Sequence, residues 1–249
     1  MLRAHNEEAT LEECIQSLRS LTVPHEIVVI LHCCTDSSRG IAERLAAEEG
    51  SRIRILEYVH ALSRAGYEHL ATDVGSVHSM SYYTSWCRAQ CRFPWVFKWD
   101  ADFIASPQLI EFLNAQEWSA GPPKYYRIAA RNEEHVNAEL YCCRGVINYG
   151  KYLFWEVPSY LPGEIVELNH DIHIYHKSTI DNLKTYWRAA PWFAESDEPE
   201  AVTVRSRVER LVADYGPEPE GMARARNPAC DAVNLALITR VPDYVNFRA

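Results

Sequence analysis

Apolar residues near the start of the chain recur at helical spacing. After Thr10 they stand three and four residues apart, which is the spacing of one buried helix face. The residues on this face are Leu11, Cys14, Ile15 and Leu18. Thr10 and Glu13 also have the spacing of a capping box, in which the two side chains satisfy each other's backbone N–H groups. We therefore expect an amphipathic helix with Thr10 as its N-cap.

Three short runs are rich in β-branched or aromatic residues and predict buried strands. They cover residues 26–31, 52–56 and 93–97. Residues 35–38, after the first run, have side chains suited to the N-cap of a helix that continues through Leu45. An order of helix, strand, helix, strand is typical of βαβ units. The predicted fold class is therefore α/β, with a mostly parallel central sheet flanked by helices.

The rest of the chain changes character. A helix at residues 80–91 leads into the aromatic run, and Ser106-Pro107 are typical of an N-cap followed by the first helical residue. After a break at 121–123, the pattern predicts short strands at 125–130, 139–142 and 164–168, helices at 180–189 and 201–215, and a loop at 216–221. The acidic run at 195–200 predicts a solvated surface segment.

Composition narrows the class of protein. The chain has 249 residues and a formal net charge of −9, which argues against general nucleic-acid binding. No apolar run approaches the roughly 18 to 20 residues of a membrane span, and no secretory signal is visible at the N-terminus. The eight cysteines have neither CxxC nor zinc-ribbon spacing. We expect reduced structural thiols in a cytoplasmic protein, which would work at the inner face of a membrane if its substrate is attached to lipid.

Two carboxylates directly follow the aromatic run. Asp100 and Asp102 form a DxD element after Lys98-Trp99. Unpaired charge at the end of a buried strand is strongly unfavourable, and a divalent cation is the simplest partner for two carboxylates. Mg²⁺ and Mn²⁺ favour oxygen ligands, and Mg²⁺ sites combine one or two carboxylates with substrate phosphates. Because ligands of open α/β sheets bind beyond the carboxyl ends of strands, the DxD element predicts a cation and phosphate site.

Three segments together resemble family 2 glycosyltransferases of the GT-A fold. They are residues 3–8 followed by Leu11 and Leu18, residues 26–38, and residues 98–102. They come in the family's order and at about its spacing over the first 105 residues, whereas the second half matches only loosely. The resemblance implies one-step inverting transfer of a sugar from a nucleotide-sugar donor to a hydroxyl of a glycan or lipid-linked saccharide acceptor. It also implies Mn²⁺ or Mg²⁺ as cofactor, because a cation stabilises the charge on the departing diphosphate.

The resemblance assigns roles to particular residues. Those implied for the nucleotide-sugar site are Ala4, Asn6, Glu7, His32, Asp36, Arg64, Lys98 and Asp100, and those implied for the cation are Asp100, Asp102 and His176. Plainer roles stay open: Asn6 and Glu7 as caps of the first helix, Asp36 as an acid that holds its loop through backbone hydrogen bonds, Arg64 as a surface residue and Lys98 as a charge at a strand end.

The chain departs from the family at the end of the second strand. Where family members carry an acid that contacts uracil, this chain has Leu31 followed by His32. The departure weakens the case for a UDP-sugar and leaves GDP-, dTDP- and CMP-linked sugars open. His32 becomes a candidate to stack on or hydrogen-bond the base, the alternative being a packed loop histidine. The first strand is also short, so either the true start lies upstream or the chain is one segment of a longer protein.

The resemblance also implies that the general base is an acid beyond the DxD element. Residues 144–156 loosely resemble the family segment that ends in such an acid, which favours Glu156 over Glu133, Glu134 and Asp171. Further on, His170, His173 and His176 form an HxxHxxH array. On a strand His173 would face away from the other two histidines, which argues against one shared zinc ion.

We expect residues 1–249 to form a single GT-A-like domain, with a nucleotide-sugar half at 1–105, an acceptor half at 106–215 and a C-terminal extension at 216–249. Near Arg188, the aromatic residues Trp187, Trp192 and Phe193 suit either a surface for lipid-linked acceptors, and hence peripheral membrane association, or a buried core. Two other functions stay open: a non-catalytic nucleotide- or glycan-binding domain of a larger protein, and a phosphatase of the haloacid dehalogenase type, whose DxDxT pattern this chain does not match.

Overall fold

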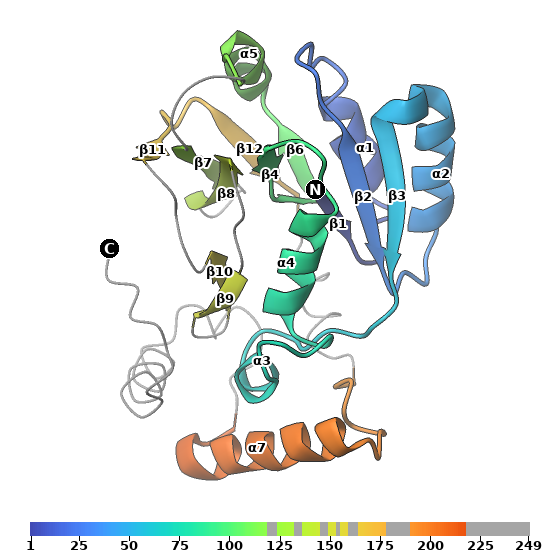
Figure 1. Ribbon diagram of the computed structural model, residues 1–249, viewed down its shortest axis with the longest axis vertical. Helices are drawn as coiled ribbons and strands as arrows, with labels where there is room; N and C mark the ends of the chain where they lie inside the picture. Colours follow the sequence, from blue (N-terminus) through green and yellow to red (C-terminus); the bar gives the residue numbers. More distant parts are fainter. Residues whose placement is uncertain are drawn as a thin grey trace. The chain divides into compact units, whose positions relative to one another are not determined.

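The chain forms two compact units, each assembled from separate segments (Figure 1). The computed structural model describes residues 1–118, 124–131, 136–144, 149–152, 155–158, 164–177 and 190–217. The first unit comprises Met1–His60, Ser85–Ile147 and Tyr160–Ser178, and the second comprises Ala61–Thr84, Asn148–Ser159 and Thr179–Ala249. Several predicted features lie outside the described residues: the break at 121–123, the helix at 180–189, most of the loop at 216–221, Glu133, Glu134, Trp187 and Arg188.

The first unit contains a four-stranded parallel sheet with the order β3-β2-β1-β5. Its strands are β1 (Leu2–Ala4), β2 (Ile27–His32), β3 (Ile53–Tyr58) and β5 (Trp99–Asp100). The first five residues of β2 are all buried, as expected for a parallel strand covered on both faces. The predicted α/β class with a parallel central sheet is confirmed, and the strands predicted at 26–31 and 52–56 are found with ends shifted by one or two residues.

Helices α1 (Leu11–Ser17) and α2 (Ser38–Glu49) pack against each other beside this sheet (Figure 1). The predicted capping box is wrong. Thr10 does stand at the N-cap of α1, but its side chain makes no capping hydrogen bond. Its hydroxyl instead donates to Oε2 of Glu7, three residues earlier in the chain, at 2.9 Å. The Glu7 carboxylate is partly buried and therefore needs such a donor.

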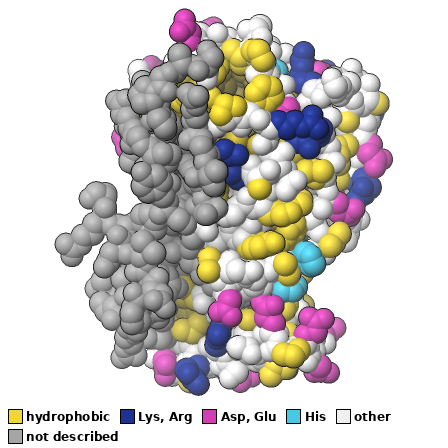
Figure 2. Space-filling view, in the orientation of Figure 1, with side chains coloured by type: hydrophobic (Ala, Val, Ile, Leu, Met, Phe, Trp, Pro, Cys, Tyr) yellow, Lys and Arg dark blue, Asp and Glu magenta, His cyan; other side chains and the backbone are white. Residues whose placement is uncertain are grey.

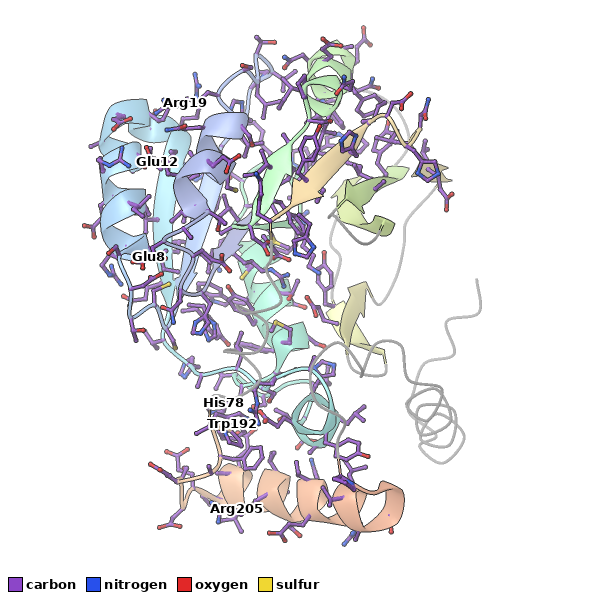
Figure 3. All side chains as sticks on the ribbon, turned by 180° about the vertical axis from the view of Figure 1, so that it is seen from behind. Glu8, Glu12, Arg19, His78, Trp192 and Arg205 are labelled. Carbon is purple, nitrogen blue, oxygen red and sulfur yellow. The ribbon has the colours of Figure 1, made fainter. Side chains whose placement is uncertain are left out.

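Exposed ion pairs join the outer surfaces of α1 and α2. Arg44 reaches Glu12 at 2.6 Å, and Arg19 reaches Glu48 at 2.8 Å. Figure 3 shows Glu12 and Arg19 on this side of the molecule, and Figure 2 shows acidic and basic side chains alternating along the edge formed by α2. Because these side chains are 40 to 47% exposed, each pair contributes little to stability.

The aromatic run does not form one buried strand, contrary to the prediction for residues 93–97. Phe93 is 41% exposed, and Trp95–Phe97 form β4, which pairs with a strand of a second sheet. The chain crosses between the sheets at Lys98 and continues as β5. The reason is backbone pairing with β1. The Trp99 N–H donates to the Met1 carbonyl and the Ala101 N–H to the Arg3 carbonyl, both at 2.9 Å, so this segment pairs with the edge of β1 in the first sheet.

The second sheet of the first unit has six strands, in the order β4-β8-β7-β12-β6 with β11 pairing beside β7. Its further strands are β6 (Phe103–Ala105), β7 (Lys124–Arg131), β8 (Val136–Arg144), β11 (Glu164–Glu167) and β12 (His173–His176). They include the strands predicted at 125–130 and 139–142, and the strand predicted at 164–168 is found as β11, which ends one residue earlier. The antiparallel pairing of β12 with β6 sets His176 opposite Phe103, next to the DxD turn.

Helix α5 (Pro107–Ala115) follows β6 and begins where the sequence predicts. Ser106 is its N-cap, and the Ser106 hydroxyl accepts a hydrogen bond from the Leu109 N–H at 3.1 Å. Leu109, Ile110 and Leu113 are buried in the main core together with residues of the first sheet and α1. This core lies directly behind the DxD segment, since Trp99, Ala101 and Phe103 belong to it.

The second unit holds α3 (Tyr67–Ala71), α7 (Pro199–Tyr215) and the hairpin of β9 (Tyr149–Tyr152) and β10 (Trp155–Pro158), while α4 (Met80–Ala89) is divided between the units. Helices α4 and α7 confirm those predicted at 80–91 and 201–215. Phe193 is buried against α7, and Trp192 stacks on His78 with ring centroids 3.8 Å apart (Figure 3). The sequence left open whether these aromatic residues form a surface for lipid-linked acceptors or a buried core. Phe193 belongs to a buried core.

Among the described residues, Cys14, Cys33, Cys34 and Cys91 are free cysteines. In the described part of the chain, no helix combines the length and the apolar character that crossing a membrane requires.

Candidate functional site

The carboxyl ends of β1, β2 and β5 bring three segments to one edge of the parallel sheet. Residues 5–7 follow β1, residues 33–36 follow β2, and the DxD segment includes the end of β5. This edge is where open α/β sheets bind their ligands. Most predicted site residues of the first unit gather here.

Asp100 is held by an arginine on the neighbouring strand. Arg3 and Asp100 are register partners on β1 and β5, and Arg3 Nε and Nη2 both reach Asp100 Oδ1, at 2.7 and 2.6 Å. Their side chains are 12% and 33% exposed, so this charge-assisted pair is partly shielded from water. Sequence reasoning missed Arg3. The available signal was its place between Leu2 and Ala4, whose side chains face the core on the other side of the strand.

Asp102 has a different partner. His176 Nε2 lies 2.9 Å from Asp102 Oδ2, and the Lys177 N–H donates to the Asp102 carbonyl at 2.8 Å. The other carboxylate oxygen, Asp102 Oδ1, is buried and has no hydrogen-bond partner among the described residues. Within the described ranges, no group of three or more His, Cys, Asp or Glu residues is arranged to hold a metal ion.

Glu7 is the third carboxylate at this edge. Its backbone N–H donates to Ser38 Oγ at 2.8 Å, which ties the segment after β1 to the start of α2. Burial raises the pKa of Glu7 to about 7, the negative charges of Asp102, Asp100 and Asp36 act in the same direction, and the hydrogen bond from Thr10 opposes them. Glu7 therefore exchanges a proton near neutral pH, and its charge responds to the charge on the DxD element.

Asn6 and Asp36 tie the loops after β1 and β2 together. Asn6, in a left-handed backbone conformation with φ 57°, accepts a hydrogen bond from the Thr35 N–H at 2.7 Å. Asp36 accepts from the N–H groups of Glu8 and Ser38 at 2.9 and 3.0 Å. Burial acts to raise the pKa of Asp36, but the hydrogen bonds from Ser38 and Glu8 outweigh it and lower the pKa. Both side chains thus shape the edge on which the carboxylates stand.

His32 is the last residue of β2 and lies at the same edge of the sheet. Leu31 is 1% exposed and packs in the main core, so His32 is the residue at this strand end that can meet a ligand. His32 Nε2 lies 3.1 Å from the His60 carbonyl, and its ring lies 4.9 Å from the ring of His5. Burial lowers the pKa of His32 to about 4, helped by the charges of His5 and Arg3. The imidazole is therefore neutral at physiological pH, and its Nε2–H is the donor to His60.

Other predicted residues lie elsewhere. Ala4 is buried, so only its backbone borders the edge, and Lys98 is half-buried at the crossing from β4 to β5. Arg64 is in the second unit, where it forms an ion pair with Glu68. Glu156 belongs to β10 of the same unit and is half-buried.

The histidine array does not form one cluster. His173 is buried and its Nδ1–H donates to the Asp171 carbonyl at 2.9 Å, whereas His170 is exposed and His176 faces Asp102. Asp171 is exposed in the turn before β12.

Comparison with known proteins adds the family. Residues 2–116 match the family model described as glycosyl transferase family 2. No curated protein sequence matches the chain. Among solved structures, the chain is similar to S. aureus TarS 1–349, with 14% identity, a TM-score of 0.49, and coverage of 85% of this chain and 70% of that one. It is also similar to the mannosyltransferase PcManGT from Pyrobaculum calidifontis in complex with GDP-Man and Mn²⁺, with 13% identity, a TM-score of 0.46, and coverage of 96% and 73%.

The sheet order and the acidic edge define an α/β protein with carboxylates gathered beyond the ends of its parallel strands, where open α/β sheets bind ligands. Residues 2–116, which contain β1 to β6 and α5, match glycosyl transferase family 2, and this match supports a glycosyltransferase with the GT-A type of α/β fold. The resemblance predicted from the sequence is confirmed.

Proposed function

We propose that this glycosyltransferase moves a sugar from a nucleotide-sugar donor to a hydroxyl of a glycan or lipid-linked saccharide, with inversion and with Mn²⁺ or Mg²⁺ as cofactor. The observation that carries the proposal is Asp102 Oδ1, a buried carboxylate oxygen without a partner in the described part of the chain, at the edge of the sheet where open α/β sheets bind ligands. Leaving such an oxygen unpaired is unfavourable. A divalent cation supplies the missing partner.

The residues present fit such a cation. Asp102 would hold it through Oδ1, while Nε2–H of His176 keeps Oδ2. A histidine that donates to a ligating carboxylate orients that ligand, and loss of such an outer contact commonly lowers metal affinity about 10- to 100-fold. We therefore assign His176 to the orientation of Asp102. One carboxylate suffices, because Mg²⁺ sites typically keep waters and take further oxygen ligands from substrate phosphates. When bound, the cation stabilises the charge of the departing diphosphate.

The transfer itself needs a proton acceptor beside the acceptor hydroxyl. As that oxygen attacks the anomeric carbon, the base takes its proton, and the bond from this carbon to the diphosphate oxygen breaks. Glu156 remains our proposed base. Asn6 and Asp36 take no part in the proton transfer. Their hydrogen bonds fix the loops after β1 and β2, which frame the proposed donor site.

His32 stays a candidate to stack on or hydrogen-bond the base of the donor. Its neutral ring lies at the carboxyl end of β2, where its Nε2–H donates to the His60 carbonyl at 3.1 Å. Because Leu31 stands where family members carry an acid that contacts uracil, the case for a UDP-sugar is weaker, and GDP-, dTDP- and CMP-linked sugars stay open.

Calorimetric titration tests the proposal. UDP, GDP, dTDP and CMP are each titrated with and without Mn²⁺ into the wild-type protein, Asp102→Asn, and the matched control Asp197→Asn, which removes an exposed charge of the second unit. We expect Mn²⁺-dependent binding of one nucleotide, lost in Asp102→Asn and kept in Asp197→Asn. Folded protein that binds no nucleotide, or binds equally well without Mn²⁺, would contradict the proposal. Binding without sugar transfer to any saccharide hydroxyl would favour the non-catalytic alternative.

A further inference from the structure

The two carboxylates of the DxD element are held in opposite ways. Asp100 is paired with Arg3, whose guanidinium is permanently charged, through two contacts to the same oxygen. Asp102 is held by a histidine through one oxygen, and its other oxygen has no partner among the residues that the structure describes. The element therefore does not present two equivalent anionic groups to a ligand.

Register explains why Arg3 can do this. Arg3 and Asp100 lie directly beside each other on adjacent parallel strands, and the Ala101 N–H donates to the Arg3 carbonyl at 2.9 Å. The backbone bond fixes the two residues at the same height in the sheet. Because the Arg3 side chain is only 12% exposed, its charge is less screened than that of a surface arginine.

We propose that Arg3 is a positioning residue that sets the charge balance of the donor site, by fixing Asp100 and cancelling its negative charge. The inference rests on the proposed function, because it concerns the same cation and diphosphate. With Arg3 present, a cation at Asp102 meets one uncompensated carboxylate of the DxD element, and the diphosphate meets a site that is less negative by one charge.

This role predicts changes of opposite sign for the two ligands. Replacement of Arg3 by methionine, which has a similar length and no charge, exposes a cation at Asp102 to a second uncompensated carboxylate. Affinity for Mn²⁺ alone should then rise, on the order of tenfold for a unit charge a few ångströms away and partly screened. Affinity for the nucleoside diphosphate should fall by a similar factor, since the added charge repels it. A purely structural role would weaken both.

The experiment measures both ligands separately. Mn²⁺ binding is followed by electron paramagnetic resonance of the free ion, and nucleotide binding by calorimetry, on wild-type protein, Arg3→Met and Arg3→Lys. Arg54→Met is the matched control, because Arg54 is a partly buried arginine of the same sheet that pairs with Glu26 at 3.1 Å near the opposite edge. Thermal unfolding of each variant verifies that it is folded.

We expect tighter Mn²⁺ and weaker nucleotide binding for Arg3→Met, Mn²⁺ affinity within about twofold of wild type for Arg3→Lys because the charge is kept, and no change of either for Arg54→Met. Folded Arg3→Met that loses affinity for both ligands, or changes neither, would overturn the inference and leave the proposed function standing. Wild-type protein that binds nucleotide but no Mn²⁺ would overturn the inference together with the metal dependence. Wild-type protein that binds neither ligand would overturn the whole proposal.

Discussion

Glu7 should make the protein less stable as pH rises through neutrality. The pKa of Glu7 is raised from 4.5 to about 7 in the folded protein, chiefly by burial. Below pH 4.5 the group is protonated in both the folded and the unfolded chain and has no effect on stability. Between pH 4.5 and 7 the unfolded chain loses this proton while the folded chain keeps it, so the free energy of unfolding falls with rising pH.

The size of the effect follows from the shift. Each pKa unit corresponds to about 1.36 kcal/mol, so a shift of two to three units destabilises the folded chain by about 3 kcal/mol above pH 7. Glu7→Gln removes the titration and keeps an oxygen that can accept the Thr10 hydrogen bond. We expect the variant to gain roughly 2 to 3 kcal/mol over wild type on going from pH 5 to pH 8.

Urea unfolding at pH 5 and pH 8, with a chelator to remove cations, measures this difference. The same substitution at the adjacent, exposed Glu8 serves as the matched control. If wild type and Glu7→Gln showed the same dependence of unfolding free energy on pH, burial of Glu7 would not be the cause that we infer, and the reasoning would be refuted.

Three further substitutions test the site and the fold. Asp102→Ala should abolish metal-dependent turnover, a loss of at least about 100-fold, with an unchanged thermal midpoint; undiminished turnover would sink the metal assignment. His176→Gln should lower Mn²⁺ affinity about 10- to 100-fold by releasing Asp102, and unchanged affinity in a Mn²⁺ titration would contradict its orienting role. Ser106→Ala should reduce the free energy of unfolding by about 1 to 2 kcal/mol, because its hydroxyl caps α5. Ser37→Ala, at the N-cap of α2 but without a capping bond, should cost much less; equal losses in urea unfolding would argue against the cap.

The sequence was sufficient for features that depend on local pattern. The continuous apolar run of β2 requires burial on both faces, and Ser106-Pro107 combines two residue types that agree on one helix start. Prediction failed where a partner outside the recognised pattern decided the outcome. Thr10 has the spacing of a capping box, but its hydroxyl serves Glu7, and residues 93–100 split between two sheets because β1 competes for Trp99.

The candidate site shows the same limit. The DxD element marked Asp100 and Asp102, and the resemblance to the family marked His176, all from sequence. The pairing that gives the two carboxylates different roles was hidden, since Arg3 looks like any polar residue of a short strand until β5 is placed beside β1. Arg64 and Glu156, which belong to the second unit, keep their predicted roles as proposals.

The crossing at Lys98 has a consequence for the order in which the site is completed. Asp100 is anchored to a residue 97 positions earlier in the chain, and Asp102 to one 74 positions later. A growing chain that has reached α5 already contains Arg3 but has not yet produced His176 or β12. Contacts so distant in sequence form late, because their loops must close first. Full cation affinity would therefore be reached only after β12 has docked on β6, and its rise during refolding would time the final assembly of the first unit.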